Sequence, residues 1–236
     1  MVRIAFLNNM HSSVMWEQAA KTIEEIAFQR FGQRDYAELR ERCQNGDIDL
    51  LITDMTQETP ALRELSDAVR LVTHRVALSP LLGGDFSTVS EAEAETVRAY
   101  FAVVSKENYV NGLKYLAAKA GASCEAEAPK PVRTNGIYHP EAGETFESAD
   151  DYFAWRNVHF SEKNERTPIG LICYYGQIAE QNIADVDAVI TALEEENLLP
   201  ICVFCDSINP AKESLEAMYP WYSIFKNLPE KPLAIL

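Results

Sequence analysis

Residues 168–205 read PIGLICYYGQIAEQNIADVDAVITALEEENLLPICVFC, and this stretch decides the fold. The apolar runs at residues 168–175 and 199–205 have the length of buried strands. Between them, residues 184–196 place four apolar side chains at helical spacing: Val186, Val189, Ile190 and Leu193. A strand, a helix and a second strand in this order predict a parallel sheet covered by helices.

The N-terminal half repeats this rhythm. Apolar runs at residues 2–7, 48–54 and 75–79 predict three more buried strands. Helical patterns predict one helix from the Ser12-Ser13 cap through Ala27, with Gly32 near its end, and shorter helices at residues 36–43 and 59–69. A longer helical region follows Ser90 as one helix or as two that break near Ser105, and it stops at Gly121.

Residues 124–134 are rich in alanine, proline and glutamate and predict a linker. We therefore expect a first α/β unit at residues 1–123, ending in the long helical segment, and a second at residues 135–236. Each is expected to be a Rossmann- or flavodoxin-like parallel-sheet unit. A helix over residues 211–227 and a last strand at residues 232–236 leave the second unit incomplete, because no helix follows to cover that strand.

The composition excludes several classes of protein. The chain has 236 residues, 47% of them hydrophobic, and a formal net charge of −15. Such a charge repels phosphates, so neither nucleic acid nor an anionic membrane surface is an expected partner. No apolar run reaches bilayer-spanning length and the first residues lack a secretion signal, which predicts a cytoplasmic protein.

The chain's five cysteines fit reduced cytosolic thiols better than a disulfide framework. Cys202 and Cys205 form a C-x-x-C spacing, but they lie on a predicted strand. Their sulfur atoms should therefore diverge, and a structural role is expected. No metal site and no catalytic residue is predicted, because no second ligand pair and no nucleophile–base arrangement can be found by spacing.

The loop at residues 8–13, NNMHSS, follows the first strand and precedes a helix. Ligands of open α/β sheets bind outside the carboxyl ends of the strands, so this loop is well placed. His11 and Ser12 are the candidate ligand-binding residues in it. An ordinary exposed loop is the alternative.

A third motif, residues 135–156, reads NGIYHPEAGETFESADDYFAWR. Pro140 fixes the backbone and restricts His139 to extended values, so Tyr138 and His139 keep one orientation. The aromatic cluster that follows is expected to cover the start of the second unit. The motif is interpreted either as a rigid docking joint between the two units or as a corner that presents Tyr138 and His139 to a ligand.

These motifs, in order, resemble the CobN/ChlH family, the large subunits of ATP-dependent cobaltochelatases and magnesium chelatases. The resemblance covers about residues 100–204. It rests on ENYVNGLKYLA at residues 107–117, YHP at 138–140, YFAWR at 152–156, IGLICYY at 169–175, N at 182 with DVDAVITALE at 185–194, and LPICVF at 199–204. Two positions depart from the family pattern. Gly176 stands where the family has arginine, and Ile183 where it has threonine.

The resemblance implies a tetrapyrrole substrate, Co²⁺ or Mg²⁺ as the inserted ion, and AAA+ partner subunits that hydrolyse ATP. No cofactor is assigned to this chain itself. The expected function is that of the N-terminal region of a CobN-type large subunit. It would contribute to binding of hydrogenobyrinate diamide, or to subunit assembly, for cobalt insertion in cobalamin biosynthesis. Tyr138, His139 and Asn182 are the implied ligand-binding residues, besides His11 and Ser12.

Three alternatives stay open at this point. The chain could belong to a magnesium chelatase subunit that binds porphyrin. It could be a non-catalytic module whose two lobes bind a small anion at the loop of residues 8–13. It could also be an assembly domain whose acidic face contacts partners.

Overall fold

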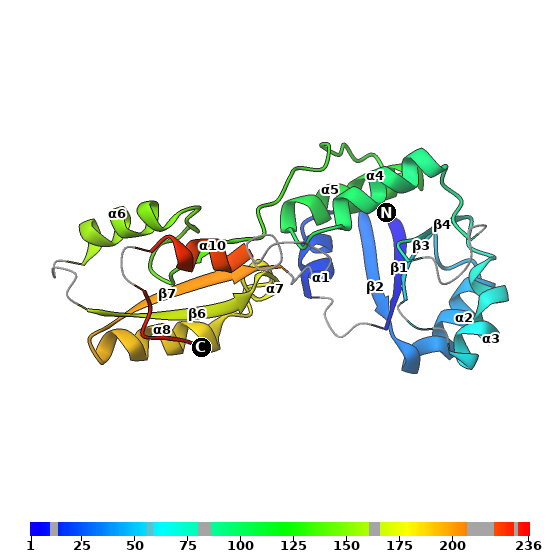
Figure 1. Cartoon of the computed structure of the whole chain (residues 1–236). Helices are drawn as coiled ribbons and strands as arrows, with labels where there is room; N and C mark the ends of the chain where they lie inside the picture. Colours follow the sequence, from blue (N-terminus) through cyan, green and yellow to red (C-terminus); the bar gives the residue numbers. More distant parts are fainter. Residues whose placement is uncertain are drawn as a thin grey trace. The chain divides into compact units, whose positions relative to one another are not determined.

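The computed structural model describes residues 1–9, 14–55, 57, 59–79, 86–160, 166–206, 220–228 and 231–236. The chain forms two compact units, Met1–Pro131 and Val132–Leu236, and each is described by itself (Figure 1). The predicted ligand residues His11 and Ser12 lie outside the described residues. Among the helices that are described, none has the length and apolarity needed to cross a membrane.

The first unit is built on a four-stranded parallel sheet. Its strands are β1 (Val2–Asn8), β2 (Ile26–Phe31), β3 (Leu50–Asp54) and β4 (His74–Ala77), in the order β2-β1-β3-β4. β1 and β3 are almost completely buried, as expected for strands covered on both faces. The flavodoxin-like fold expected for this half of the chain is confirmed.

One expected element is wrong. The helix predicted through Ala27 ends at Ala20, because α1 comprises only Val14–Ala20, and the chain then enters β2. The backbone N–H of Val2 donates to Glu25 O at 2.7 Å, and Ile26 pairs with Val2 from there on. Apolar residues continue at helical spacing beyond Ala20, but the pairing of β2 with β1 outweighs this local preference for a helix.

Three of the described helices of the first unit begin at a side-chain cap. A short 3₁₀ helix, η1 (Gln33–Asp35), leads into α2 (Tyr36–Gln44), and Thr59 caps α3 (Pro60–Val69). Ser90 and Glu93 form a capping box for α4 (Glu91–Phe101), and Ser105 caps α5 (Lys106–Lys119). The helical region after Ser90 is therefore two helices with a break before Lys106.

Two apolar clusters lie on the two faces of the first sheet. Phe6 and Ile52 pack with Trp16 of α1 and Leu113 of α5. On the other face, Leu7 and Leu51 pack with side chains of α2 and α3, including Leu39 and Leu65. Helices thus cover both faces (Figure 1). Gly112 permits close packing of α4 on α5, because a Cβ there would lie 2.5 Å from Phe101 Cζ.

The second unit contains a mixed sheet in the order β5-β7-β6-β8. Its parallel strands are β6 (Thr167–Tyr174), β7 (Leu198–Cys205) and β8 (Ala234–Ile235). The edge strand β5 (Gly136–Tyr138) runs antiparallel to β7 and was not predicted. The expected parallel sheet therefore holds for β6, β7 and β8 but not for β5.

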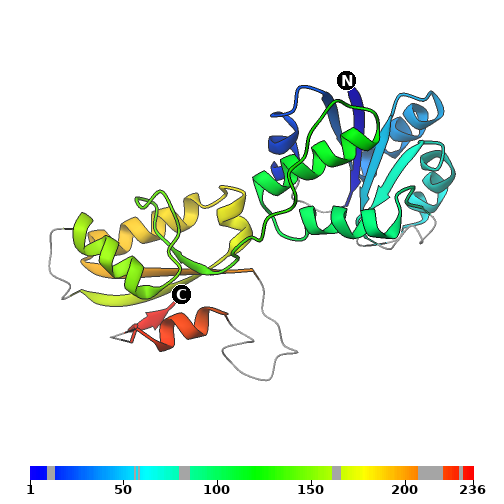
Figure 2. The same cartoon turned by 90° about the horizontal axis from the view of Figure 1, so that it is seen from above.

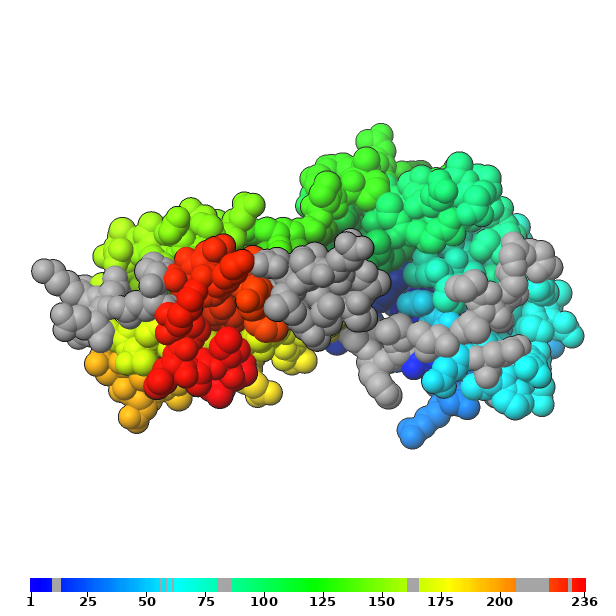
Figure 3. Space-filling view, viewed as in Figure 1, coloured from blue at the N-terminus to red at the C-terminus, as the bar shows by residue number. Residues whose placement is uncertain are grey.

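The described residues of this unit form four helices: α6 (Ala149–His159), α7 (Tyr175–Ala179), α8 (Ala184–Glu195) and α10 (Pro220–Lys226). Side chains of α6 and α10 pack on one face, where Ile137, Ile201 and Val203 form the core. α8 lies on the opposite face (Figures 1 and 2). The C-terminal segment, red in Figure 3, lies at the surface, with Leu233 76% exposed.

Candidate functional site

The Tyr-His-Pro corner lies where β5 ends. Tyr138 is the last residue of β5 and pairs with Cys202 of β7, and His139 and Pro140 follow directly. His139 is 1% exposed, and its ring packs 4.9 Å from the ring of Trp155 on α6. The corner and the aromatic helix, read together in the sequence, are therefore in contact within the second unit.

A buried ion pair lies behind this corner. Arg156 of α6 is only 2% exposed, and its Nη1 lies 2.7 Å from Glu194 Oε1 on α8. The same nitrogen is 3.3 Å from the hydroxyl of Tyr152, which in turn donates to Pro200 O at 2.6 Å. The guanidinium also stacks on Phe160, 4.3 Å from the ring centre. These contacts join α6, α8 and β7 around His139.

The hydrogen bonds of His139 fix its tautomer. The backbone N–H of Glu141 donates to Nδ1 at 3.3 Å, so Nδ1 is the acceptor and the proton resides on Nε2. Nε2 lies 3.4 Å from Glu194 Oε1 and donates to it. Burial lowers the pKa of His139, which keeps the ring neutral. Both ring nitrogens are engaged here, and a direct contact of His139 with a ligand stays a prediction.

Tyr138 holds its proton firmly. Its hydroxyl donates to Asp187 Oδ1 of α8 at 2.8 Å. Burial, and then this hydrogen bond, raise the pKa of Tyr138. The side chain is therefore a neutral, oriented polar group at the end of β5.

A hollow of about 300 Å³ opens beside Tyr138. Its walls come from the corner, from the loop after it and from the segment between α7 and α8. They are lined by Tyr138, His139, Pro140, Gly143, Glu144, Thr145, Ile178, Gln181 and Ile183. Asn182 lies between two of these residues, and its backbone N–H donates to Gln177 O at 2.8 Å. The structure thus brings Tyr138, His139 and the segment containing Asn182 to one place.

Sequence reasoning missed Gln181, Thr145 and Asp187 at this site. Gln181 has a φ of 56°, a left-handed conformation that is uncommon outside glycine and occurs at functional turns. Nothing in the local sequence signals that conformation. The position of Asn182 between α7 and α8 was the available hint, since its neighbours form the wall.

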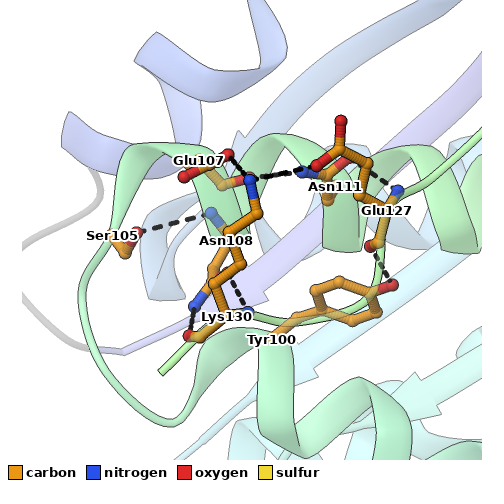
Figure 4. Close-up of polar contacts among 7 residues, drawn as sticks. All are labelled: Tyr100, Ser105, Glu107, Asn108, Asn111, Glu127 and Lys130. Carbon is orange, nitrogen blue, oxygen red and sulfur yellow. Dashed lines mark hydrogen bonds and ion pairs between the residues drawn. The ribbon is translucent and has the colours of Figure 1, made fainter. Parts of the chain in front are cut away.

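A second polar cluster involves the ENYVN motif of α5 (Figure 4). Asn108 Nδ2 donates to Lys130 O at 2.8 Å, and the Lys130 N–H donates back to Asn108 Oδ1 at 2.9 Å. Asn111 Oδ1 accepts from the Glu127 N–H at 3.0 Å, and the Tyr100 hydroxyl donates to Glu127 O at 2.6 Å. The two asparagines therefore hold the first part of the expected linker against the first unit.

Two buried cysteines lie side by side in the second sheet. Cys202 Sγ lies 3.6 Å from Cys173 Sγ on the neighbouring strand, and the hydrogen bond between them, then burial, raise the pKa of Cys202. Leu171, not Cys173, is the direct strand partner of Cys202, so the two thiols are diagonal neighbours. Within the described parts of the chain, no three His, Cys, Asp or Glu residues are grouped to hold a metal ion.

The family model for CobN/Magnesium Chelatase matches residues 98–231, more than half of the chain. The chain belongs to this family. The match includes α5, the Tyr-His-Pro corner and the hollow, whereas the sheet of the first unit precedes it.

Two curated relatives and one solved structure resemble this family member. An uncharacterized protein of Methanocaldococcus jannaschii is 31% identical over 50% of this chain and 9% of its own length. The aerobic cobaltochelatase subunit CobN of Sinorhizobium sp. is 28% identical over 59% of this chain and 12% of its own. The catalytic subunit of cobaltochelatase from Mycobacterium tuberculosis has a TM-score of 0.52 at 16% identity, over 90% of this chain and 17% of that one. The chain spans less than a fifth of each of these relatives.

Proposed function

We propose that this chain acts as part of a cobaltochelatase-type large subunit in cobalamin biosynthesis. Its family membership supports this, as do the two cobaltochelatase subunits among its relatives. Because the chain spans only 9–17% of the three relatives, metal insertion requires further protein. We assign it the N-terminal part of such a subunit, working with AAA+ partners that hydrolyse ATP. The ion is a substrate, and cobalt is favoured over magnesium by these relatives.

Within that role, the hollow beside Tyr138 contacts the tetrapyrrole. The observation that carries this proposal is that Tyr138 and the Gln181–Ile183 segment form one wall around about 300 Å³. This is the lower limit of small-molecule pockets, so it takes a peripheral group rather than the whole macrocycle. Thr145 and Gln181 offer neutral polar groups in that wall.

Charge selects which peripheral group enters. Glu144 lines the hollow, and Asp187 accepts the hydrogen bond of Tyr138. Carboxylates at this position repel a carboxylate substituent of the macrocycle, whereas an amide substituent can pair with Gln181 and can accept from the Thr145 hydroxyl, whose oxygen already accepts from Arg133 Nη2 at 3.1 Å. The proposal therefore favours the amide side of hydrogenobyrinate diamide.

The chain's affinity for hydrogenobyrinate diamide, followed by the absorbance of the macrocycle, tests the assignment. Gln181→Ala and Thr145→Ala should each weaken binding about fivefold to tenfold, the value of one lost hydrogen bond. Gln44→Ala changes an exposed glutamine of the first unit and serves as the matched control. Equal affinities for the three variants would place the macrocycle elsewhere.

Subunit docking is a second candidate function, favoured by the acidic surface after the corner. Five exposed carboxylates lie within eleven residues: Glu141, Glu144, Glu147, Asp150 and Asp151. Such a surface suits a partner with a basic face and speeds its association. Co-elution of AAA+ subunits with the chain, lost in a Glu147→Gln, Asp150→Asn variant that still binds the macrocycle, would assign docking to this surface.

A further inference from the structure

The sheet of the first unit has a reversal of strand order between β1 and β3. β1 is joined to β2 through α1, which packs on one face, while α2 and α3 pack on the other. In open parallel sheets, ligands bind outside the carboxyl ends of the strands at such a reversal. The residues that end the two strands here are Asn8 and Asp54, which are direct partners in the register.

The orientation of the Asn8 side chain is fixed by Arg30. Asn8 is 2% exposed, and its Oδ1 accepts a hydrogen bond from Arg30 Nε at 2.8 Å. A guanidinium can only donate, so the oxygen of the amide must face Arg30. The NH₂ group of Asn8 has no hydrogen-bond partner in the portion of the chain that is described.

Asp54 is a half-buried carboxylate without a hydrogen bond or ion pair to any described residue. Burial raises its pKa, which means that its environment does not stabilise the charge. Asp49, just before the same strand, is by contrast a carboxylate with partners. Its Oδ1 lies 2.7 Å from Arg3 Nη2, and its Oδ2 accepts from the backbone N–H of Arg3 at 2.8 Å.

The backbone beside Asp54 is held in place. The Met55 N–H donates to Ser79 Oγ at 3.1 Å, the Ser79 hydroxyl donates to Met55 O at 2.7 Å, and the Leu78 N–H donates to Thr53 O at 2.8 Å. The ends of β3 and β4 are thus cross-linked. Asp54 is preorganised rather than part of a loose turn.

We propose that Asn8 and Asp54 bind a hydroxyl-bearing small ligand, such as a ribose, at the carboxyl ends of β1 and β3. A hydroxyl group can accept from the Asn8 amide and donate to the Asp54 carboxylate at the same time. An anion would be repelled by Asp54, so this pair of side chains does not support the alternative of a small-anion site at this edge. The site lies outside residues 98–231 and is independent of the tetrapyrrole contact.

The stability of two aspartate variants tests whether Asp54 is structural. Asp54→Asn should leave the urea midpoint of the chain unchanged or raise it, because it removes an uncompensated charge. The matched change Asp49→Asn removes a paired carboxylate and should lower the midpoint. A loss of stability in Asp54→Asn as large as that in Asp49→Asn would show a structural carboxylate and overturn the proposal.

Binding is measured by amide chemical shifts of the whole chain during titration with adenosine. Saturable shifts at Asn8 and at residues 53–55 are expected, and Asp54→Ala should weaken the affinity about tenfold or more. The same titration with 2′,3′,5′-trideoxyadenosine, which lacks all three ribose hydroxyl groups, should give none of these shifts. Absence of shifts with adenosine, or equal shifts with both nucleosides or in Asp54→Ala, would overturn the proposal.

Discussion

Replacing Glu194 with glutamine tests the buried network that fixes the Tyr-His-Pro corner. The change keeps the size of the side chain and removes its charge. It leaves the guanidinium of Arg156, 2% exposed, without a carboxylate 2.7 Å away. Removing one partner of a buried pair costs about 3–5 kcal/mol, and because glutamine can still accept a hydrogen bond we expect about 3 kcal/mol.

The reverse change should cost less. Arg156→Met removes the buried charge and keeps most of the apolar volume, while Glu194, with a side chain 17% exposed, retains water and the His139 contact. We expect a loss of about 1–2 kcal/mol. In the double variant the losses should not add, since the two groups interact directly. A coupling of about 1–3 kcal/mol is expected.

The assay is urea unfolding followed by tryptophan fluorescence. Trp16→Phe serves as the background, because Trp155 and Trp221 then report on the second unit. Glu147→Gln is the matched control in the same unit. It breaks an exposed pair with Arg133 and should cost at most about 1 kcal/mol. A Glu194→Gln variant no less stable than this control would refute the buried network.

Three further predictions concern single residues. Burial depresses the pKa of His139 below its usual 6.5, so the stability that the neutral ring contributes is complete above about pH 6.5 and is lost as the pH falls. Urea unfolding of the control variant His159→Gln between pH 7.5 and 5.5 should show this loss of stability. His139→Gln lacks the buried ring and should lose less stability over the same range. Parallel pH profiles for the two variants would contradict the prediction. Asn108→Ala removes two hydrogen bonds to Lys130 and should speed cleavage by a glutamate-specific protease after the neighbouring Glu127 about tenfold, whereas unchanged cleavage would mean that the segment is held otherwise. Gln181→Gly relieves a left-handed backbone and should raise stability by about 0.5–1 kcal/mol in thermal unfolding while weakening tetrapyrrole binding; a destabilised variant would contradict this.

Local pattern was sufficient where an element buries most of its side chains. β3, β6 and β7 are continuous apolar runs, so their sequence alone specifies them, whereas the sequence left open whether α4 and α5 are one helix or two. β2 and β5 depend on a partner strand. β5 has three residues and is stabilised by β7, more than sixty residues later in the sequence. No local signal could have predicted it.

The site divides in the same way. The motifs placed Tyr138, His139 and Asn182 in the second unit, and the structure brings Tyr138, His139 and the two neighbours of Asn182 around one hollow. The pairing of Arg156 with Glu194 depends on two helices that meet only in the folded unit. The sequence predicted His139 as a ligand-binding residue. In the folded unit both of its ring nitrogens are already engaged, one with the Glu141 N–H and the other with Glu194.

Amide chemical shifts of the chain during titration with hydrogenobyrinate diamide test the central claim most directly. Contact of the macrocycle with the hollow predicts saturable shifts at Tyr138, Thr145 and Gln181, with the amide of Asn108 unchanged as the internal reference. Shifts confined to other residues, or none at saturating macrocycle, would contradict the claim that this hollow receives the tetrapyrrole.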